Sequence, residues 1–236
     1  MGRNNYFQFK KFRVVQENSA MKVGIDGVLL GAWANLAEAS SILDIGTGTG
    51  LLALMAAQRS DAEIEAVELE PDAAAEAQFN VDESPWSSHL SVHVCAIQDF
   101  ETTKRYDHII SNPPFFENGS TSVDLKRKQA RHVVALTMQE LLVKSKSLLN
   151  THGKISLILP AEKEERLLIL ASQLNLIPVR LCRVAPDETK KAHRILVELS
   201  DELKPVESTQ LTIRDGASGE FSMEYRDLTS DFYLNL

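Results

Sequence analysis

Residues that could hold and activate an amine follow a short apolar run that begins at Asp107. Asn112 is followed by Pro113, Pro114 and the aromatic Phe115. Because proline has no backbone N–H and holds φ at about −65°, this stiff loop offers carbonyl acceptors and almost no donors. The Asn112 amide oxygen and the Pro113 carbonyl can each accept one N–H of an NH2 group. Both bonds strengthen as positive charge develops on the nitrogen.

The planar group that carries such an amine can stack on Phe115. Adenine and carboxamides both fit this description, since their nitrogen lone pair is delocalised into a neighbouring π system. The alternative is a tight strand-to-loop turn in which Asn112 is a cap and Phe115 is a core residue. A four-residue motif does not decide between the two, so the rest of the chain must.

A glycine-rich turn lies between a predicted strand and a predicted helix. Ile42 to Ile45 has the continuous apolar character of a buried parallel strand, and Leu51 to Arg59 is predicted to be helical. Backbone without side chains can approach a nucleotide at such a helix N-terminus. The dinucleotide fingerprint G-x-G-x-x-G requires glycine where Leu51 stands, so the spacing favours a methyl-donor site over NAD. The candidate cofactor-binding residues are Asp44, Gly46, Thr47, Gly48 and Gly50.

An acidic residue ends the next predicted strand, Ile64 to Val67. Glu68 lies 22 residues beyond Gly46. This is close to the spacing at which an acidic side chain accepts both ribose hydroxyls of a nucleotide cofactor. Glu70 is a competing candidate for the same role. Leu69, between the two acids, is also a candidate cofactor contact.

The segment before the first predicted helix is a further candidate part of the cofactor site. Asp26 is predicted to be the N-cap of a helix from about Gly27 to Ala37, because its carboxylate can accept N–H groups of the first turn. Packing alone does not account for the preceding segment, Met21 to Gly24, which can lie over a bound cofactor. Lys22 and Gly24 are its candidate contacts.

Strands and helices alternate along the chain, which predicts an α/β fold with helices on both faces of a mostly parallel sheet. Seven strands are expected in a Rossmann-like arrangement. The last two, joined only by Ala185 to His193, are expected to form an antiparallel hairpin. Beyond those already named, strands are predicted at Leu90 to Val94, Asp107 to Ser111, Lys154 to Leu159, Ile177 to Val184 and Arg194 to Leu199.

Further elements complete the predicted architecture. A strand pair is expected around Phe7 to Val14, where aromatic residues alternate with polar or basic ones. The remaining helices are predicted to begin at Pro71, at the capping box Thr137 to Glu140, and at Glu162. The C-terminal region is expected to add a strand at Leu211 to Ile213 and a closing helix over Met223 to Leu236.

Length and composition are those of a soluble protein with one large core. The chain has 236 residues, 44% of them hydrophobic, and we expect one domain over 1–236 with a short basic N-terminal extension to about residue 20. No apolar run approaches the roughly 20 residues that cross a bilayer, and the N-terminus lacks a signal-peptide core. We therefore expect a cytoplasmic protein. Cys95 and Cys182 are expected to be unpaired, buried small side chains.

Charge is distributed unevenly. The net charge of −8 argues against non-specific coating of nucleic acid, yet the first sixteen residues contain basic side chains and no acidic ones. Two later clusters are also basic. A solvated surface is the alternative for each cluster, but three together favour a rim that binds phosphates. The candidate residues are Arg3, Lys10, Lys11, Arg13, Lys126, Arg127, Arg131, Lys190 and Lys191.

Taken together, these segments resemble the Rossmann-like S-adenosylmethionine-dependent methyltransferases with an NPP[FY] motif. The sequence is most similar to the bacterial tRNA (adenine-N6) methyltransferases that modify the adenosine beside the anticodon of valine tRNA. The resemblance rests on AMKVGIDGVLLGAWA, LDIGTGTGLLALMAAQR, AVELEPDAAAEAQ, SNPPFF, QAR near Arg131 and the final DFYL. It implies an enzyme whose cofactor is S-adenosylmethionine and whose partner is the anticodon stem-loop of a tRNA. In that family the glycines approach the methyl donor, Glu68 holds its ribose, and Asn112, Pro113 and Phe115 hold the target base.

One position departs from the family pattern. An acidic residue usually follows the third strand to receive the cofactor's adenine amine, and Ala96 occupies that position here. Either Asp99 takes the role or a backbone carbonyl near Ala96 and Ile97 does. Ile97 is therefore a candidate cofactor contact.

Two other functions remain open from the sequence. Glutamine N5 methylation of a protein needs the same acceptors, although only a short basic segment precedes the cofactor motifs. A catalytically silent RNA-binding subunit should have lost cofactor residues, yet the glycine turn, Glu68 and the NPPF motif are intact. The six histidines are scattered without paired metal-ligand spacing, so no metal is expected. The sequence leaves the oligomeric state open.

Overall fold

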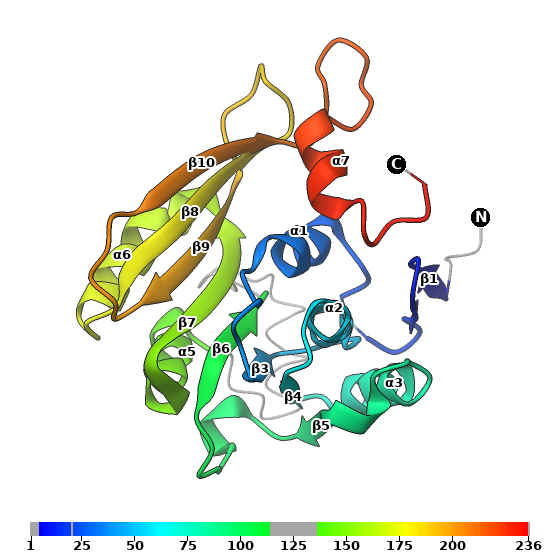
Figure 1. Cartoon of the computed structure of the whole chain (residues 1–236), viewed down its shortest axis with the longest axis vertical. Coiled ribbons are helices and arrows are strands. Elements are labelled where there is room, and N and C mark those ends of the chain that lie inside the picture. The colour runs from blue at the N-terminus through cyan, green and yellow to red at the C-terminus, as the bar shows by residue number, and fades with distance from the viewer. Residues whose placement is uncertain (1–4, 20, 114–135, 236) are drawn as a thin grey trace, which may run out of the picture.

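The computed structural model describes residues 5–19, 21–113 and 136–235. Within them one eight-stranded sheet has the order β10-β8-β9-β7-β6-β3-β4-β5 (Figure 1). Its strands, in chain order, are β3 (Ser41–Ile45), β4 (Glu63–Glu68), β5 (Leu90–Val94), β6 (Tyr106–Ser111), β7 (Leu149–Pro160), β8 (Ile177–Ala185), β9 (Arg194–Ser200) and β10 (Glu207–Thr212). Of these described strands, β9 alone runs against its neighbours β7 and β8.

The predicted α/β class, the mostly parallel sheet and the β8–β9 hairpin are confirmed. The sheet contains eight strands instead of seven because β10 pairs in parallel with β8, from Glu207 opposite Arg180 to Thr212 opposite Ala185. The short strand predicted at Leu211 to Ile213 is the end of this longer one. Apolar alternation is weak in β10, whose first four residues are exposed, so the sequence marked only its buried end.

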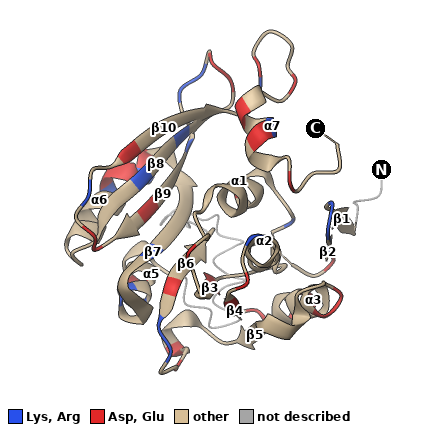
Figure 2. Cartoon of the chain, viewed as in Figure 1, with Lys and Arg blue, Asp and Glu red and all other residues tan. Residues whose placement is uncertain are grey.

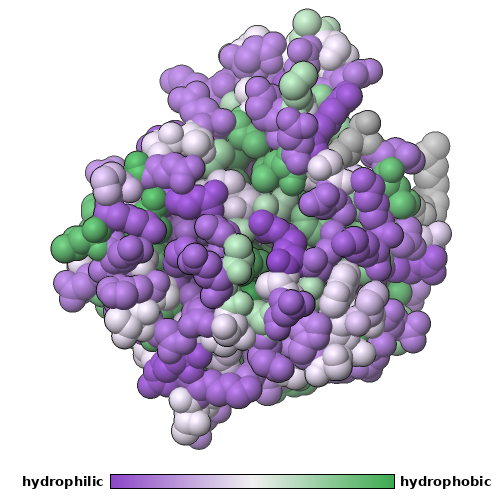
Figure 3. All heavy atoms as spheres, viewed as in Figure 1, coloured by the Kyte–Doolittle hydropathy of each residue, from purple (hydrophilic) through white to green (hydrophobic). Residues whose placement is uncertain are grey.

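Helices cover both faces of the sheet and enclose two hydrophobic clusters. Helices α1 (Ile25–Trp33), α2 (Leu51–Arg59), α3 (Pro71–Asp82) and α7 (Met223–Thr229) contribute to one cluster. Helices α5 (Met138–Leu148) and α6 (Glu164–Ser172) contribute to the other. Most polar residues of the helices lie on their outer sides, with Glu76 and Asn80 of α3 among the buried exceptions. The face seen in Figure 3 is mostly hydrophilic. No helix in the described ranges is long and apolar enough to cross a membrane.

Helix α1 differs from its predicted form at both ends. Its N-cap is Gly24, without a side-chain cap, and Asp26 lies inside the first turn. The Asp26 carboxylate instead accepts a 2.8 Å bond from Arg194 Nε. The helix ends at Trp33, four residues before the predicted Ala37, because Ala34 leaves helical geometry. Arg59 Nη1 then donates to the carbonyls of Gly31 and Ala34 near that end.

Other predicted helices are confirmed with adjusted ends. Thr137 and Glu140 form both halves of the capping box before α5. Pro71 begins α3, and a short 3₁₀ turn, η3 (Ala161–Lys163), precedes α6. The closing helix α7 stops at Thr229, whose carbonyl accepts the amides of Phe232 and Tyr233 as the chain turns back.

The predicted N-terminal strand pair is also confirmed and packs against the C-terminal tail. Strands β1 (Tyr6–Gln8) and β2 (Arg13–Val15) are antiparallel. Phe9 and Phe12 are buried beside them, and Phe9 forms an antiparallel bridge with Tyr233. Both ends of the described chain therefore lie on the same side of the molecule (Figure 1).

Candidate active site

The candidate site lies where the strand order reverses. From β3 the chain builds outward through β4 and β5, then returns to place β6 on the other side of β3. Ligands of open α/β sheets bind at the carboxyl ends of the strands flanking such a point. Ser111 Oγ, at the end of β6, donates a 2.7 Å hydrogen bond to the carbonyl of Ile45, at the end of β3. This bond brings the residue before Asn112 beside the residue before the glycine turn.

The glycine turn has a backbone that other residues adopt poorly. Gly46, Gly48 and Gly50 have φ of 72°, 57° and 83°, in the left-handed region that favours glycine. A Cβ built on Gly46 or Gly48 meets nothing within 4 Å, so these two face open space. A Cβ on Gly50 would lie 3.5 Å from Ala77 of α3. The turn thus presents bare backbone at the N-terminus of α2, as the sequence predicted for a nucleotide site.

Asp44 is hydrogen-bonded to the glycine turn through one carboxylate oxygen, and its other oxygen has no hydrogen-bond partner among the described residues. The side chain is fully buried, and its Oδ2 accepts bonds from Thr47 Oγ1 at 2.5 Å and from Ala53 N at 3.2 Å. Its Oδ1 has no hydrogen-bond partner among the described residues. Burial raises the Asp44 pKa to about 7, although both hydrogen bonds lower it. An unpartnered buried acceptor is costly unless a donor reaches it, so the site fits a ligand that brings an N–H group.

Glu68 is held by backbone amides at the end of β4. Its Oε2 accepts from Gly48 N at 2.8 Å and its Oε1 accepts from Glu70 N at 3.0 Å. Each oxygen keeps a further lone pair, so the fixed carboxylate can still accept two hydroxyls. Glu68 is bonded to the glycine turn itself through Gly48 N, whereas Glu70 precedes α3 as its N-cap, so the geometry favours Glu68 over its competitor. Leu69, between them, is 39% exposed beside the turn.

The position without the expected acid lies after β5. Asp99 N donates to the Ala96 carbonyl at 3.0 Å, within the 3₁₀ turn η2 (Ile97–Asp99), and Ile97 is buried. The Asp99 residue also lines a depression of about 520 Å³ along β5, together with Cys95 and Phe100. The Ala96 carbonyl retains one lone pair. Both the side chain and the carbonyl thus remain candidates for contact with an adenine amine.

The NPPF motif is only partly described. Asn112 is half-buried and Pro113 is buried, immediately after β6. Pro114 and Phe115 lie outside the described residues, as do Arg3, Lys126, Arg127 and Arg131. Gly24 begins α1, and Lys22 precedes it on the exposed side of the same segment.

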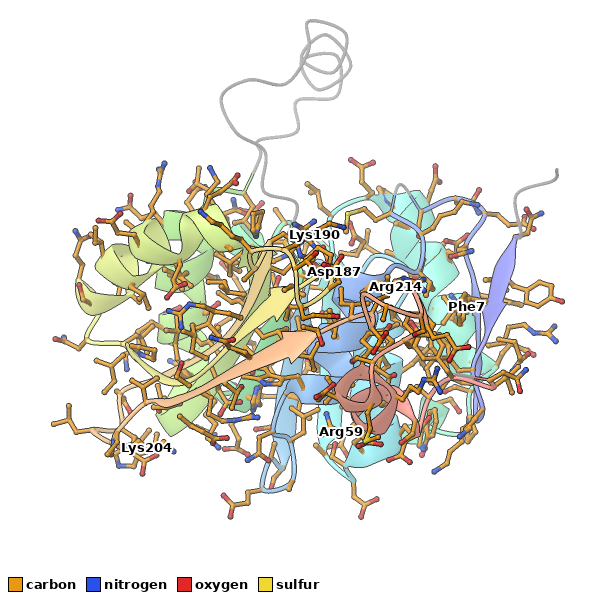
Figure 4. All side chains as sticks on the ribbon, turned by 90° about the horizontal axis from the view of Figure 1, so that it is seen from above. Phe7, Arg59, Asp187, Lys190, Lys204 and Arg214 are labelled. Carbon is orange, nitrogen blue, oxygen red and sulfur yellow. The ribbon has the colours of Figure 1, made fainter. Side chains whose placement is uncertain are left out.

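The described basic candidates are less free than the sequence suggested. Lys10 Nζ donates to the Ser230 carbonyl at 2.6 Å, and Lys190 Nζ pairs with Asp187 at 2.8 Å. Figure 4 shows the side chains of Lys190 and Asp187 next to each other. The Arg13 guanidinium lies 4.5 Å from the centroid of the Tyr6 ring.

Lys11 and Lys191 are exposed. Along the described part of the ribbon in Figure 2, basic and acidic segments are interspersed. No group of three or more His, Cys, Asp or Glu in the described part of the chain could hold a metal ion.

Two polar residues of α3 were missed by the sequence analysis. Asn80 donates to the carbonyls of Val15 and Thr49, both at 2.9 Å, and accepts from Val15 N at 2.8 Å. Glu76 accepts from backbone amides of the segment that follows β2. The available signal was their spacing of four residues on an alanine-rich helix, which places both on one face.

Comparison with solved structures defines the class of fold. A predicted O-methyltransferase from Agrobacterium tumefaciens aligns with a TM-score of 0.66 at 17% identity, covering 88% of this chain and 96% of that one. An S-adenosylmethionine-dependent class I methyltransferase from Listeria monocytogenes, itself described as putative, aligns with a TM-score of 0.59 at 16% identity, covering 92% and 70%. Residues 27–175 match the family model "Methyltransferase small domain". The fold and the glycine turn are therefore those of a class I methyltransferase.

More similar relatives narrow the family. A protein of Parabacteroides distasonis is 42% identical over 99% of both chains, and one of Shewanella sp. is 44% identical over 98% of this chain and 99% of its own. Both are named tRNA1(Val) (adenine(37)-N6)-methyltransferase, as is a relative from Aeromonas salmonicida that is 42% identical over the full length of both chains. The chain belongs to this methyltransferase family, as the sequence motifs predicted.

Proposed function

We propose that this protein transfers a methyl group from S-adenosylmethionine to N6 of the adenosine beside the anticodon of tRNA1(Val). Full-length similarity to relatives with that name supports the substrate. The observation that supports the chemistry is the 2.7 Å bond from Ser111 to Ile45, because it joins the residue before Asn112 to the residue before Gly46. A cytoplasmic location, where tRNA is available, follows from the same proposal.

The cofactor-binding residues have separate roles. When bound, S-adenosylmethionine supplies a methyl group on a positively charged sulfur that an amine can attack. Glu68 accepts the ribose hydroxyls, and Asp44 Oδ1 accepts an N–H from the cofactor's ammonium. The open backbone at Gly46 and Gly48 lets the ligand approach closely. The remaining contacts that we assign are Lys22, Gly24, Thr47, Gly50, Leu69, Ile97 and Asn112.

The acceptor amine is held and activated by the NPPF motif. The Asn112 side-chain oxygen and the Pro113 carbonyl accept its two N–H groups, so the nitrogen can pyramidalise and direct its lone pair outward. These bonds strengthen as the nitrogen becomes positive, which stabilises the transition state more than the ground state. Pro114 keeps the loop stiff and Phe115 stacks on the base. The methylated ammonium is acidic and loses its proton without a strong base.

The RNA must present its adenosine unstacked, which requires least free energy in a single-stranded loop. The basic residues predicted from the sequence hold the phosphates around it. Among the described ones, Lys11 and Lys191 are exposed, whereas Lys10 and Lys190 already have partners. We therefore assign phosphate contacts first to Lys11 and Lys191, and after them to Arg13, whose Nε donates to Gln8 Oε1.

The test is nucleoside analysis of tRNA from cells that lack this protein. We expect N6-methyladenosine to disappear from tRNA1(Val) and to return on complementation. Purified enzyme with labelled donor should methylate that tRNA and leave peptide release factors, the substrates of the glutamine alternative, unlabelled. Label in a release factor but not in tRNA would contradict the proposal.

Asn112→Ala should abolish turnover and leave donor binding nearly unchanged, because the amine loses one of its two acceptors whereas the donor loses one contact among many. The matched control is Asn150→Ala. Asn150 donates to Asp107 at the opposite end of β6, so it should retain activity. Single-turnover methylation and calorimetric titration with the donor measure the two effects. Equal loss of both functions in the Asn112 variant would indicate a damaged loop instead of missing chemistry.

A further inference from the structure

A buried carboxylate on α3 binds a segment that the chemistry above leaves without a role. Glu76 is 5% exposed. Its Oε2 accepts from Glu17 N at 2.5 Å and from Asn18 N at 2.7 Å, and its Oε1 accepts from Ser19 N at 3.1 Å. Hydrogen bonds to a charged group are about twice as strong as neutral ones. Three in succession fix the backbone of residues 17–19 on α3.

These residues belong to a segment, here called the strap, formed by residues 16–19 and 21–24 between β2 and α1. A hydrogen bond also links the two parts of the strap, because the Gln16 side chain accepts a 2.8 Å bond from Val23 N. Its solvent side carries Met21, which is 52% exposed, and Lys22. The strap is thus hydrogen-bonded to α3 on its inner side and faces solvent on its outer side.

Both ends of the strap are fixed against the glycine turn. At one end, Asn80 bonds the N–H and carbonyl of Val15 and also donates to the carbonyl of Thr49. At the other end, a Cβ on Gly27 would lie 2.9 Å from Leu51, the residue after Gly50. The first turn of α1 therefore rests on the start of α2. Both ends of the strap thus lie close to Gly50, the last residue of the glycine turn, which puts the strap beside the proposed cofactor site.

We propose that Glu76 is a positioning residue that holds the strap in place over the cofactor site. Glu76 touches neither cofactor nor substrate. It acts by keeping the strap ordered before the cofactor arrives, so that binding does not have to order it. The apparent affinity of a ligand falls in proportion to the fraction of protein in the competent state. The inference rests on the proposed cofactor but needs no RNA.

Glu76→Ala removes all three acceptors. We expect the dissociation constant for S-adenosylhomocysteine to rise about tenfold, with kcat at saturating donor close to that of the wild type. Hydrogen exchange without ligand should accelerate at the amides of residues 17–19 and Val23. The amides of β3 and β6 should keep their protection, because the sheet does not depend on the strap.

Glu76→Gln is the conservative variant. One amide oxygen at the Oε2 position keeps the bonds from Glu17 and Asn18 and loses that from Ser19. Its exchange rates and ligand affinity should fall between those of the wild type and the alanine variant. If the alanine variant does not fold, the Glu76→Gln variant can be compared with the wild type in the same two measurements. Gln78→Ala is the matched control on the same helix, since Gln78 is only half-buried and its side chain donates to Asp82 of the same helix.

Three results would overturn the inference. The first is unchanged ligand affinity in a folded Glu76→Ala protein whose strap exchanges faster. The second is faster exchange throughout the sheet, which would make Glu76 a general stability residue. The third is a lower kcat at unchanged affinity. Failure of the tRNA assignment would leave the first two readouts unchanged, because ligand binding and hydrogen exchange are measured without RNA.

Discussion

Asp44 is fully buried, and its Oδ1 has no hydrogen-bond partner among the described residues. Its burial makes the stability of the protein depend on pH. Burial raises its pKa from 3.8 to about 7. Between these values the folded protein keeps a proton that the unfolded chain has released. The contribution of Asp44 to stability is therefore complete below about pH 4 and is lost as the pH rises through about 7. A donor that reaches Oδ1 would favour the ionised form and reduce this loss.

Asp44→Asn should remove that pH dependence. By linkage, the wild type should lose on the order of 4 kcal/mol of unfolding free energy between pH 4 and pH 8 relative to the variant. Any fixed destabilisation by the new amide shifts the variant's curve without changing its slope. Urea unfolding across this pH range measures both curves, with Asp61→Asn as an exposed control. Parallel curves for wild type and variant would show that Asp44 does not titrate in this range.

At the scale of elements, a buried polar row crosses three strands. His108 of β6 is hydrogen-bonded to Ser156 Oγ of β7 at 2.8 Å, and Ser156 donates to Glu198 of β9 at 3.3 Å. Burial, together with the nearby cations Lys154 and Arg180, lowers the His108 pKa from 6.5 to about 3. His108 is thus neutral in the folded protein where the unfolded chain takes up a proton. Its contribution to stability is lost as the pH falls from 6.5 toward 3.

His108→Gln should flatten the acid side of the stability curve. Between pH 6 and pH 4, the unfolding free energy of the wild type should fall more steeply than that of His108→Gln, by about 1.4 kcal/mol per pH unit. Chemical unfolding at intervals of half a pH unit tests this. His152→Gln is the control, since His152 is exposed and contacts Asp201 at the surface. An acid slope that survives in the His108 variant would assign it to other groups.

Helices α1 and α2 pack closely because Gly31 of α1 has no side chain. A Cβ at this position would lie 2.6 Å from Met55 Sδ and 3.1 Å from Met55 Cβ. Overpacking of this kind costs about 1–3 kcal/mol. The contact lies at the middle of α2 and holds this helix against α1.

Gly31→Ala should lower the unfolding free energy by about 1–3 kcal/mol, and Met55→Ala should lower it by about 2–5 kcal/mol. The double variant should be less destabilised than the sum, because the new methyl group enters the space that Met55 leaves. Urea unfolding of the four proteins completes the cycle. Strict additivity would mean that the two side chains do not share this space.

For the whole molecule, sequence reasoning succeeded where local pattern determines structure. Continuous apolar runs located the core strands, and glycines with positive φ marked the turn at Gly46. The carboxyl ends of β3 and β6 then followed from the alternation of strands and helices. Features that depend on contacts between residues far apart in the sequence could not be predicted in this way. Asp26 has the chemistry of an N-cap, but Arg194, distant in sequence, binds its carboxylate.

The partners of charged groups were the least predictable feature. Glu76 resembles any solvated acid of an acidic stretch, and only the folded chain brings residues 17–19 to it. Lys190 was predicted to bind phosphate, and Asp187 pairs with it three residues away. Composition counts charges but not the pairs they form. Among the described basic candidates, fewer are therefore free to bind phosphate than the sequence suggested.

The proposed docking of RNA depends on a few unpaired cations on a chain with a net charge of −8. Each phosphate contact releases counterions, so the logarithm of affinity falls linearly with the logarithm of salt concentration. Lys11→Ala should weaken tRNA1(Val) binding and reduce the salt slope by about 1. Lys190→Ala should change it less, because Asp187 already pairs with Lys190.

The control is Lys204→Ala. Lys204 pairs with Glu202 and lies at the end of the molecule opposite β1 (Figure 4). The salt slope of tRNA binding by this variant should therefore match that of the wild type. Fluorescence titrations of labelled anticodon stem-loop at several salt concentrations measure all four proteins. If Lys11 and Lys204 variants share the wild-type slope, the tRNA does not lie over the N-terminal hairpin. Phosphate contacts would then have to come from the carboxyl edge of the sheet alone.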